Sequence, residues 1–170
     1  MCCKTKRKIA DGLLIILADK PLKKITVQDI MELENMKRQS FYYHSQDVYE
    51  VVEWMFQEDF VGKLAYCEEE SFECWVTRAI EIVHENRFFY RRLLESVDRE
   101  RIIKMLAPVV NQQVEARFEV IRQNKNPMVK QFMVRSMCHF MLDSLQQVKA
   151  APKDEIVAAT KSMVEILKLH

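Results

Sequence analysis

The 170-residue sequence has little glycine or proline, with only 2 Gly and 4 Pro. Because these residues supply many of the tight turns that join β-strands, their scarcity argues against a fold rich in hairpins. The sequence is instead rich in Leu, Met, Glu, Lys, Gln and Arg, which are good helix formers. We therefore expect an all-α protein.

Long hydrophobic runs are also missing. No stretch approaches the roughly 20 apolar residues that a helix needs to span a bilayer. The apolar stretch after the first eight residues has no small-residue cleavage site of the kind that ends a secretory signal. We expect a cytoplasmic protein with no membrane partner.

Motifs of catalysis and of metal or disulfide chemistry are absent from the sequence. There is no Gly-rich phosphate loop, GxSxG elbow or HExxH helix, so we expect neither an enzyme nor a cofactor. The five cysteines have no CxxC spacing, which favours reduced thiols over a disulfide framework or a zinc knuckle. They are Cys2, Cys3, Cys67, Cys74 and Cys138.

Charge is distributed unevenly along the chain. A formal net charge of +1 argues against a generic polycationic binder of nucleic acid. Residues 1–45, however, carry a net charge of +4, and the remaining residues carry −3. Any contact with nucleic acid is therefore expected near the N-terminus.

The first 46 residues have the pattern of three short helices. Ile9, Leu13 and Ile16 lie at helical spacing and predict an amphipathic helix over residues 4–18, which Pro21 ends. Thr26 and Asp29 form a potential capping box for a second helix over residues 27–33.

The residues between the second and third predicted helices indicate a tight turn. Glu34, Asn35 and Met36 interrupt the apolar pattern, and Asn adopts left-handed conformations more readily than most non-Gly residues. A third helix is expected over residues 38–44, with Phe41 pointing inward. The pattern as a whole predicts a helix-turn-helix.

The rest of the chain predicts a helical body. Asp47 and Glu50 have the spacing of a cap for a fourth helix, which continues through Phe60. Further helices are expected over residues 72–85, 87–95, 99–123, 128–149 and 154–169, with a separator at 150–152. Pro108 should kink or split the 99–123 segment. We therefore divide the chain into a helix-turn-helix head, residues 1–46, and an effector and dimerisation body, residues 47–170.

The last two predicted helices are apolar over about half of their circumference, which is more than one buried face requires. Such helices need two neighbours each. We expect the second neighbour to be another copy of the chain, in a homodimer formed through these two helices.

Residues 25–53 (ITVQDIMELENMKRQSFYYHSQDVYEVVE) carry a family resemblance. The T-V-x-x-I helix, the turn and the Y-x-H helix resemble, in order and spacing, the DNA-binding signature of TetR-family transcriptional regulators. The run from Phe41 to His44 and the later Val52-Glu53-Trp54 resemble the subgroup related to the dihydroxyacetone kinase operon regulator.

The resemblance implies a homodimeric regulator, in our reading a repressor, that responds to an unknown small-molecule or protein effector. Each subunit would place one recognition helix in the major groove of a double-stranded DNA operator, with half-sites about 34 Å or more apart. Tyr43 and His44 would contact phosphates, and Arg38, Gln39 and Tyr42 would face the groove. The full set of expected DNA-binding residues is Thr26, Lys37, Arg38, Gln39, Ser40, Tyr42, Tyr43 and His44.

The sequence also departs from the family pattern. Glu34 and Asn35 occupy a turn that usually holds small residues and a Gly, and Lys37 replaces the usual Ser or Thr cap. Ser45 replaces an aromatic residue, and Val48 replaces a Lys. The negative charges of Glu32 and Glu34 lie close to where a phosphate backbone is expected to pass. They motivate an alternative: an interaction protein of the same fold that has lost sequence-specific DNA binding.

Three other features allow two interpretations. The basic residues Lys4, Lys6, Arg7 and Lys8 form either a phosphate-contacting arm or a solvated terminus. The methionines and phenylalanines of the body fill its core or line an effector pocket. A metal site built from Cys67, Cys74, His84, Cys138 and His139 is the weaker alternative to no metal, because adjacent helical residues point about 100° apart.

Overall fold

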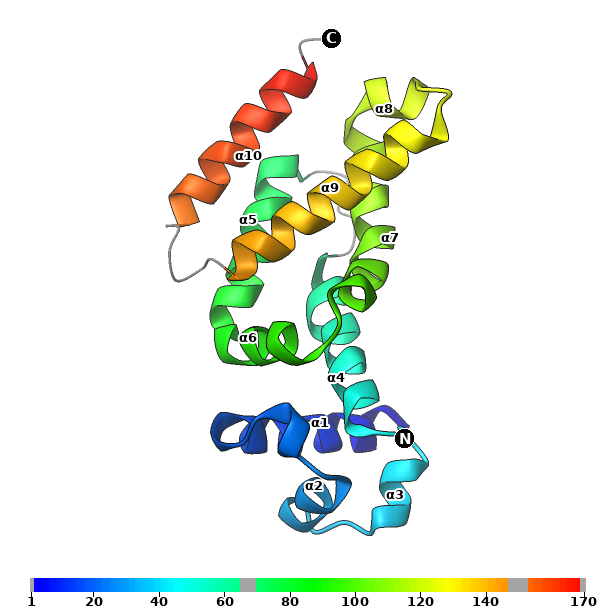
Figure 1. Cartoon of the computed structure of the whole chain (residues 1–170), viewed down its shortest axis with the longest axis vertical. Coiled ribbons are helices and arrows are strands. Elements are labelled where there is room, and N and C mark those ends of the chain that lie inside the picture. Colours follow the sequence, from blue (N-terminus) through cyan, green and yellow to red (C-terminus); the bar gives the residue numbers. More distant parts are fainter. Residues whose placement is uncertain (1, 65–69, 147–152, 169–170) are drawn as a thin grey trace. The chain divides into compact units, whose positions relative to one another are not determined.

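The computed structural model describes residues 2–64, 70–146 and 153–168. In these ranges it contains helices and no strand, which confirms the expectation of an all-α fold (Figure 1). Cys67, the separator at 150–152 and the predicted ends of the last two helices at 149 and 169 lie outside the described residues.

The chain divides into two compact units. The first, called here the head unit, comprises residues 1–59 and 87–97, and the second, the body unit, comprises residues 60–86 and 98–170. The helices of the head unit are α1 (Cys2–Asp19), η1 (Leu22–Lys24), α2 (Val27–Leu33), α3 (Arg38–Tyr42), α4 (Val48–Phe56) and α6 (Arg87–Ser96).

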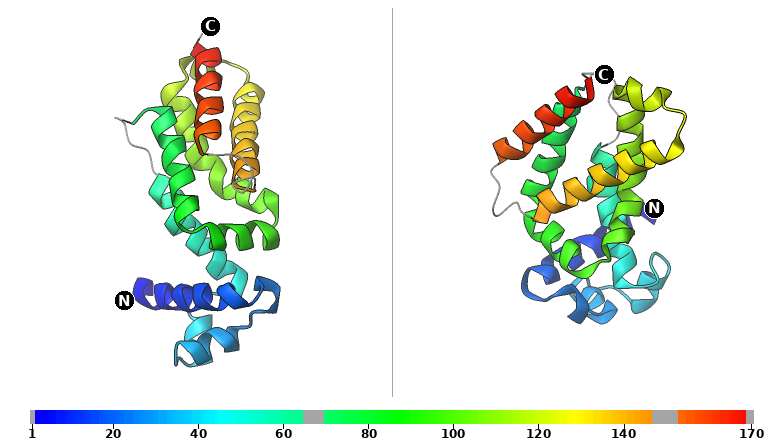
Figure 2. Two further views of the ribbon diagram at one scale, coloured as in Figure 1. Left: turned by 90° about the vertical axis from the view of Figure 1, so that its left-hand side faces the viewer. Right: turned by 45° about the horizontal axis from the view of Figure 1, so that its top comes forward.

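Helix α1 forms one side of the head core and packs on α2, α4 and α6 (Figure 2). Its buried face contains Ile9, Leu13 and Leu17, which are at most 1% exposed. Near its start, Arg7 donates two hydrogen bonds, of 2.7 and 2.9 Å, to the Asp59 carboxylate, and its guanidinium lies 4.8 Å from the centre of the Trp54 ring. These contacts fix the N-terminal part of α1 beside α4 and the residues that follow it.

The predicted short helices agree closely with the structure. Helix α2 has the predicted bounds, whereas α3 ends at Tyr42, two residues earlier than predicted. Helix α4 begins at Val48 after the Asp47 cap and passes into a π-turn, η2 (Gln57–Val61).

The body unit contains η3 (Gly62–Leu64), α5 (Phe72–Glu85), α7 (Arg99–Arg117), α8 (Glu119–Gln123), α9 (Pro127–Gln146) and α10 (Lys153–Lys168). Within it, α7 packs on α8 and α9, and α10 packs on α5. Helix α5 has the predicted bounds.

The position of the break in the 99–123 segment differs from the prediction. Helix α7 continues through Pro108, and the split lies at Phe118, whose φ of −114° and ψ of 88° are not helical. Pro108 is exposed, so water can satisfy the carbonyl that loses its helical partner. Phe118 is 3% exposed and meets Phe72 edge-on, with ring centres 5.2 Å apart. Burial of this side chain accompanies the change in chain direction.

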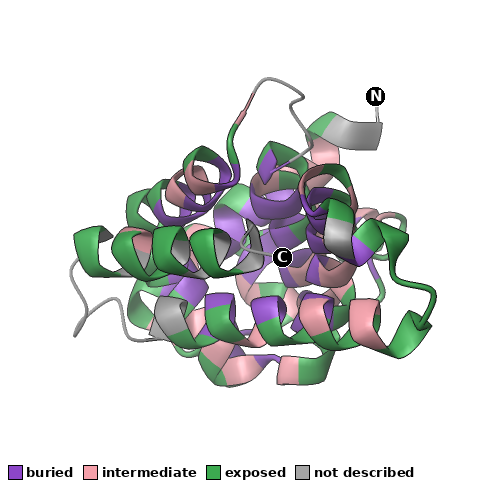
Figure 3. Ribbon diagram, turned by 90° about the horizontal axis from the view of Figure 1, so that it is seen from above, coloured by how far each residue is buried: buried purple, intermediate pink, exposed green. Residues whose placement is uncertain are grey.

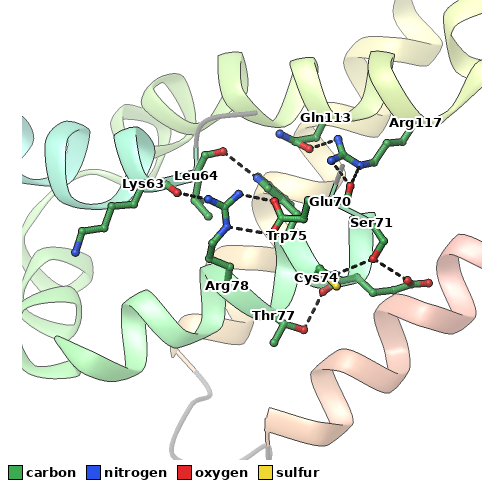
Figure 4. Close-up of polar contacts among 11 residues, drawn as sticks. Lys63, Leu64, Glu70, Ser71, Cys74, Trp75, Thr77, Arg78, Gln113 and Arg117 are labelled. Carbon is green, nitrogen blue, oxygen red and sulfur yellow. Dashed lines mark hydrogen bonds and ion pairs between the residues drawn. The ribbon is translucent and has the colours of Figure 1, made fainter. Parts of the chain in front are cut away.

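Two arginines hold Glu70, which lies two residues before α5 (Figure 4). Arg78 donates to the Glu70 carboxylate at 3.1 and 2.5 Å and to the Lys63 carbonyl at 2.6 Å. Arg117 donates to the Glu70 carbonyl at 3.0 Å and to the side-chain oxygen of the buried Gln113. Glu70 is therefore held by both its carboxylate and its backbone.

One side of α9 exposes three large apolar side chains in the single chain. Met128, Phe132 and Phe140 are 71%, 70% and 42% exposed, and multiples of four residues separate them, so they share one side of the helix. On α10, Ile166 is 63% exposed. Figure 3 shows exposed residues along both helices.

Candidate nucleic-acid interface

The start of α2 is a complete capping box. The Thr26 hydroxyl accepts from the Asp29 N–H at 3.2 Å, and the Asp29 carboxylate accepts from the Thr26 N–H at 2.7 Å. That carboxylate also accepts from Lys20 and from the Thr26 hydroxyl, each at 2.8 Å. Hydrogen bonding to Lys20 and then to Thr26 lowers the pKa of Asp29 to about 2. Thr26 is exposed, but its hydroxyl already serves the cap.

The turn between α2 and α3 is a Schellman motif, in which the residue after the helix cap is left-handed. Asn35 has a φ of 50°. The Met36 N–H donates to the Met31 carbonyl at 2.9 Å, and the Asn35 N–H donates to the Glu32 carbonyl at 3.2 Å. Asn35 thus fulfils the role that Gly has in the family pattern.

Glu34 is directed towards α1. Its side chain is only 12% exposed, with its carboxylate 3.6 Å from the Lys8 ammonium, which also donates to the Glu34 carbonyl at 3.1 Å. Gly12 provides the space, because a Cβ there would lie 2.8 Å from two Glu34 side-chain atoms. Sequence reasoning missed this contact, although a glycine inside a helix is an available signal. The Glu34 charge therefore lies against α1, and Glu32 remains an exposed acid.

Helix α3 presents a mixed basic and aromatic surface. Phe41 is fully buried, as predicted, whereas Tyr42 and Tyr43 are 51% and 79% exposed. Arg38 donates to the Tyr42 hydroxyl at 3.2 Å, and its guanidinium carbon lies 5.8 Å from the centre of that ring. This pair orders one cation at the start of the helix.

The remaining predicted residues lie around this pair. Lys37 and Gln39 are exposed, and Ser40 and His44 are half-buried. Lys37 is the N-cap of α3 and its side chain makes no capping hydrogen bond. Seven of the eight predicted residues therefore lie on α3 or directly beside it, and Thr26 lies at the start of α2.

The loop after α3 departs from the family pattern in a different way. Ser45 is 4% exposed, and among the described residues its hydroxyl has no hydrogen-bond partner. Asp47 then caps α4 by accepting from the Glu50 N–H at 2.8 Å, and the Glu50 carboxylate accepts from the Gln46 N–H at 2.6 Å. Val48 is buried, so its side chain belongs to the core.

The four basic residues near the N-terminus differ in the contacts that they make. Arg7 is paired with Asp59, Lys8 contacts Glu34, and the Lys6 ammonium lies 5.4 Å from the centre of the Trp54 ring. Lys4 is exposed. Most of this cationic segment therefore makes contacts within the head unit, although the exposed Lys4 leaves the arm interpretation open.

The candidate metal ligands do not converge in the part of the chain that the structure describes, where no group of three or more His, Cys, Asp or Glu could hold an ion. His139 accepts at Nδ1 from Arg99 at 3.2 Å. Burial raises the pKa of the Cys138 thiol to about 11, which disfavours the thiolate that metals require.

Within the described residues, no helix is long and apolar enough to cross a membrane.

Among the Met and Phe residues of the body unit considered for an effector pocket, Met105 and Met133 are half-buried, and the side chain of Met163 is not among those described. The others form a buried group and an exposed group. Those buried in the body unit are Phe118, Met137 and Met141. Those exposed on α9 are Met128, Phe132 and Phe140. Because the second group faces solvent in the single chain, the whole set does not line one pocket.

Comparison with known proteins places this architecture in a class. The structure of the dihydroxyacetone kinase operon activator DhaS is similar to this chain, with a TM-score of 0.69 and 18% identity over 95% of this chain and 97% of that one. A TetR transcriptional regulator from Streptococcus agalactiae 2603V gives a TM-score of 0.68 at 20% identity, covering 96% and 94% of the two chains. A TetR-family protein from Syntrophomonas wolfei gives 0.70 at 15%, covering 100% and 97%. The chain has the fold of TetR-family transcriptional regulators.

One curated sequence gives a more particular likeness. The HTH-type dhaKLM operon transcriptional activator DhaS from Lactococcus lactis strain IL1403 is 25% identical over 92 residues. That match covers 52% of this chain and 48% of the relative, so the chain spans about half the length of the curated relative it matches. No family model matches the sequence.

Proposed function

We propose that this protein is a homodimeric, DNA-binding transcriptional regulator of the TetR type. In this proposal residues 1–46, which lie within the head unit, are the DNA-binding region, and residues 47–170 are the effector and dimerisation region. The observation that carries this proposal is the surface of α3. A single buried residue of the helix, Phe41, fixes α3, while its neighbours Tyr42 and Tyr43 are 51% and 79% exposed.

In the proposed complex, α3 lies in the major groove. Arg38 and Gln39 reach base edges, and Lys37 reaches a phosphate, because all three are exposed at the start of the helix. Tyr43 and His44 contact the DNA backbone from the end of α3, and Thr26 and Ser40 complete the interface. The inward position of Glu34 supports this arrangement, because it reduces repulsion between the turn and the phosphates.

Two copies pair through α9 and α10 in the proposed dimer. The exposed Met128, Phe132 and Phe140 on α9 and Ile166 on α10 support this, because large apolar side chains that share a face usually mark an interface. Pairing sets the separation of the two heads. It therefore also requires an operator with two-fold symmetry.

Regulation follows from two arrangements of the dimer with different affinities for DNA. An effector, either a small molecule or a protein, shifts the balance only if it binds one arrangement more tightly than the other. We propose repression in the cytoplasm, by occupation of the operator, as the output. DhaS is described as an activator, so activation is the alternative output. A reporter gene behind the selected operator separates these two outputs.

Selection of duplexes from a randomised pool by the purified protein at moderate salt tests the proposal. We expect an enriched two-fold-symmetric site whose affinity falls steeply with rising salt, since each neutralised phosphate contributes to that slope. Lys37→Ala should lower the slope by about one unit without changing helical content or the dimer. If a well-folded dimer enriches no sequence, the proposal fails in favour of an interaction protein that retains the fold.

A further inference from the structure

A hollow of about 290 Å³ lies in the head unit between α2, the turn and the start of α3. Its lining residues are Gln28, Met31, Glu32, Asn35, Met36 and Arg38. Met31 is buried, whereas Gln28, Glu32 and Arg38 are exposed. The hollow is therefore bordered by an amide, a carboxylate and a guanidinium that solvent, or a ligand, can reach.

Gln28 and Glu32 lie one turn apart on α2 and are joined by a hydrogen bond. The Gln28 amide nitrogen donates to the Glu32 carboxylate at 2.6 Å. That bond uses one of the two amide hydrogens and sets the plane of the amide group. The amide oxygen and the second hydrogen remain available, so Gln28 can still offer one acceptor and one donor to a ligand.

An acceptor beside a donor matches the major-groove edge of adenine. A Gln amide can accept from adenine N6 and donate to N7, and an Arg can donate to guanine O6 and N7. Gln28 and Arg38 come from different helices but border one hollow. They can therefore contact neighbouring base pairs when α3 enters the groove.

We propose that α2 takes part in sequence readout: Gln28, oriented by Glu32, contacts an adenine next to the guanine contacted by Arg38. Glu32 is a positioning residue in this arrangement. Its negative charge weakens attraction to all phosphates, but its hydrogen bond makes Gln28 selective. This inference rests on the proposed function, since it requires α3 to dock in the groove.

The test repeats the duplex selection with the full-length wild type, Gln28→Ala, Glu32→Ala and Glu32→Gln. Gln123 and Glu119 provide a control, because on α8 of the body unit they form the same kind of hydrogen bond across one helical turn, in the reverse order along the chain, at 2.7 Å. Gln123→Ala and Glu119→Ala should leave the selected sequence unchanged. Circular dichroism establishes that each variant keeps the wild-type helical content.

We expect Gln28→Ala to lose the adenine preference at one position of each half-site, with discrimination there reduced about ten-fold and other positions unchanged. Glu32→Ala should lose the same preference while binding non-operator DNA more tightly. Glu32→Gln, which keeps an acceptor without the charge, should retain the preference.

Three results would overturn the inference. The first is an unchanged selected sequence with Gln28→Ala, while the wild type still enriches a symmetric site; the proposed function then stands. The second is a uniform gain of affinity with Glu32→Ala and an intact preference, which would make Glu32 a surface charge only. The third is no enrichment by the wild type, which removes the proposed function and this inference together.

Discussion

Because Gly12 contacts Glu34, the substitution Gly12→Ala should affect stability differently in the wild-type protein and in a Glu34→Ala variant. Alanine stabilises a helix interior by about 1 kcal/mol relative to glycine. In this protein, however, a Cβ at Gly12 would lie 2.8 Å from both Cγ and Oε1 of Glu34, closer than atoms can pack. The Glu34 side chain must move, and it is nearly buried beside Lys8.

Overpacking of this kind costs about 1–3 kcal/mol, so Gly12→Ala alone should leave the protein between about 0 and 2 kcal/mol less stable. Truncating Glu34 removes the obstacle. In the Glu34→Ala background, Gly12→Ala should therefore stabilise the protein by about 1 kcal/mol. The coupling between the two positions is expected to be at least about 1 kcal/mol.

Urea denaturation followed by far-ultraviolet circular dichroism measures this coupling, with all four proteins at one concentration because a dimer's stability depends on it. If Gly12→Ala stabilises the wild-type background by the full helix-propensity gain, Glu34 moves away freely. The inward position of its carboxylate would then not be a constraint on the turn.

The other predictions concern burial, DNA contact, dimerisation and pH. Ser45→Ala should raise the free energy of unfolding by about 1 kcal/mol, because it removes a buried hydroxyl without a partner; a lower value in urea denaturation would contradict this. Tyr43→Ala should weaken operator binding in a gel-shift titration with circular dichroism and dimer mass unchanged, and unaltered affinity would remove Tyr43 from the interface. Phe132→Asp should shift the mass measured by light scattering from dimer to monomer, whereas Ile15→Asp, at an exposed apolar residue of α1, should not. Equal effects of the two substitutions would exclude the α9 face as the dimer interface. The lowered pKa of Asp29 stabilises the folded state at pH values above about 4, and this contribution is lost as the pH falls towards 2. Asp29→Asn should therefore be less stable than the wild type at pH 7. The difference in the free energy of unfolding between the two proteins should close between pH 4 and 2. A gap independent of pH would show that the charge of Asp29 contributes nothing.

The sequence by itself determined the local structure of the head. Thr26 and Asp29 predict the start of α2, and Asn35 predicts its end. These signals can be found in the sequence because a capping hydrogen bond and a left-handed residue act within four residues of chain. The bounds of α5 also agree with the sequence-based prediction. The family resemblance also rests on residues that are close together in the chain, so the TetR-type fold could be predicted from the sequence alone.

Only the tertiary structure decided features that depend on distant residues. Phe118, rather than Pro108, divides the 99–123 segment, because its ring is buried against Phe72, 46 positions earlier in the sequence. Glu34 turns inward because Gly12, on another helix, leaves room for it. The hollow that Gln28 and Arg38 share exists because the turn brings α2 and α3 together, which no spacing rule along a single helix describes. Hydrogen bonds and sterics between near neighbours set where helices begin and end, whereas the direction of a side chain depends on what the folded chain places beside it.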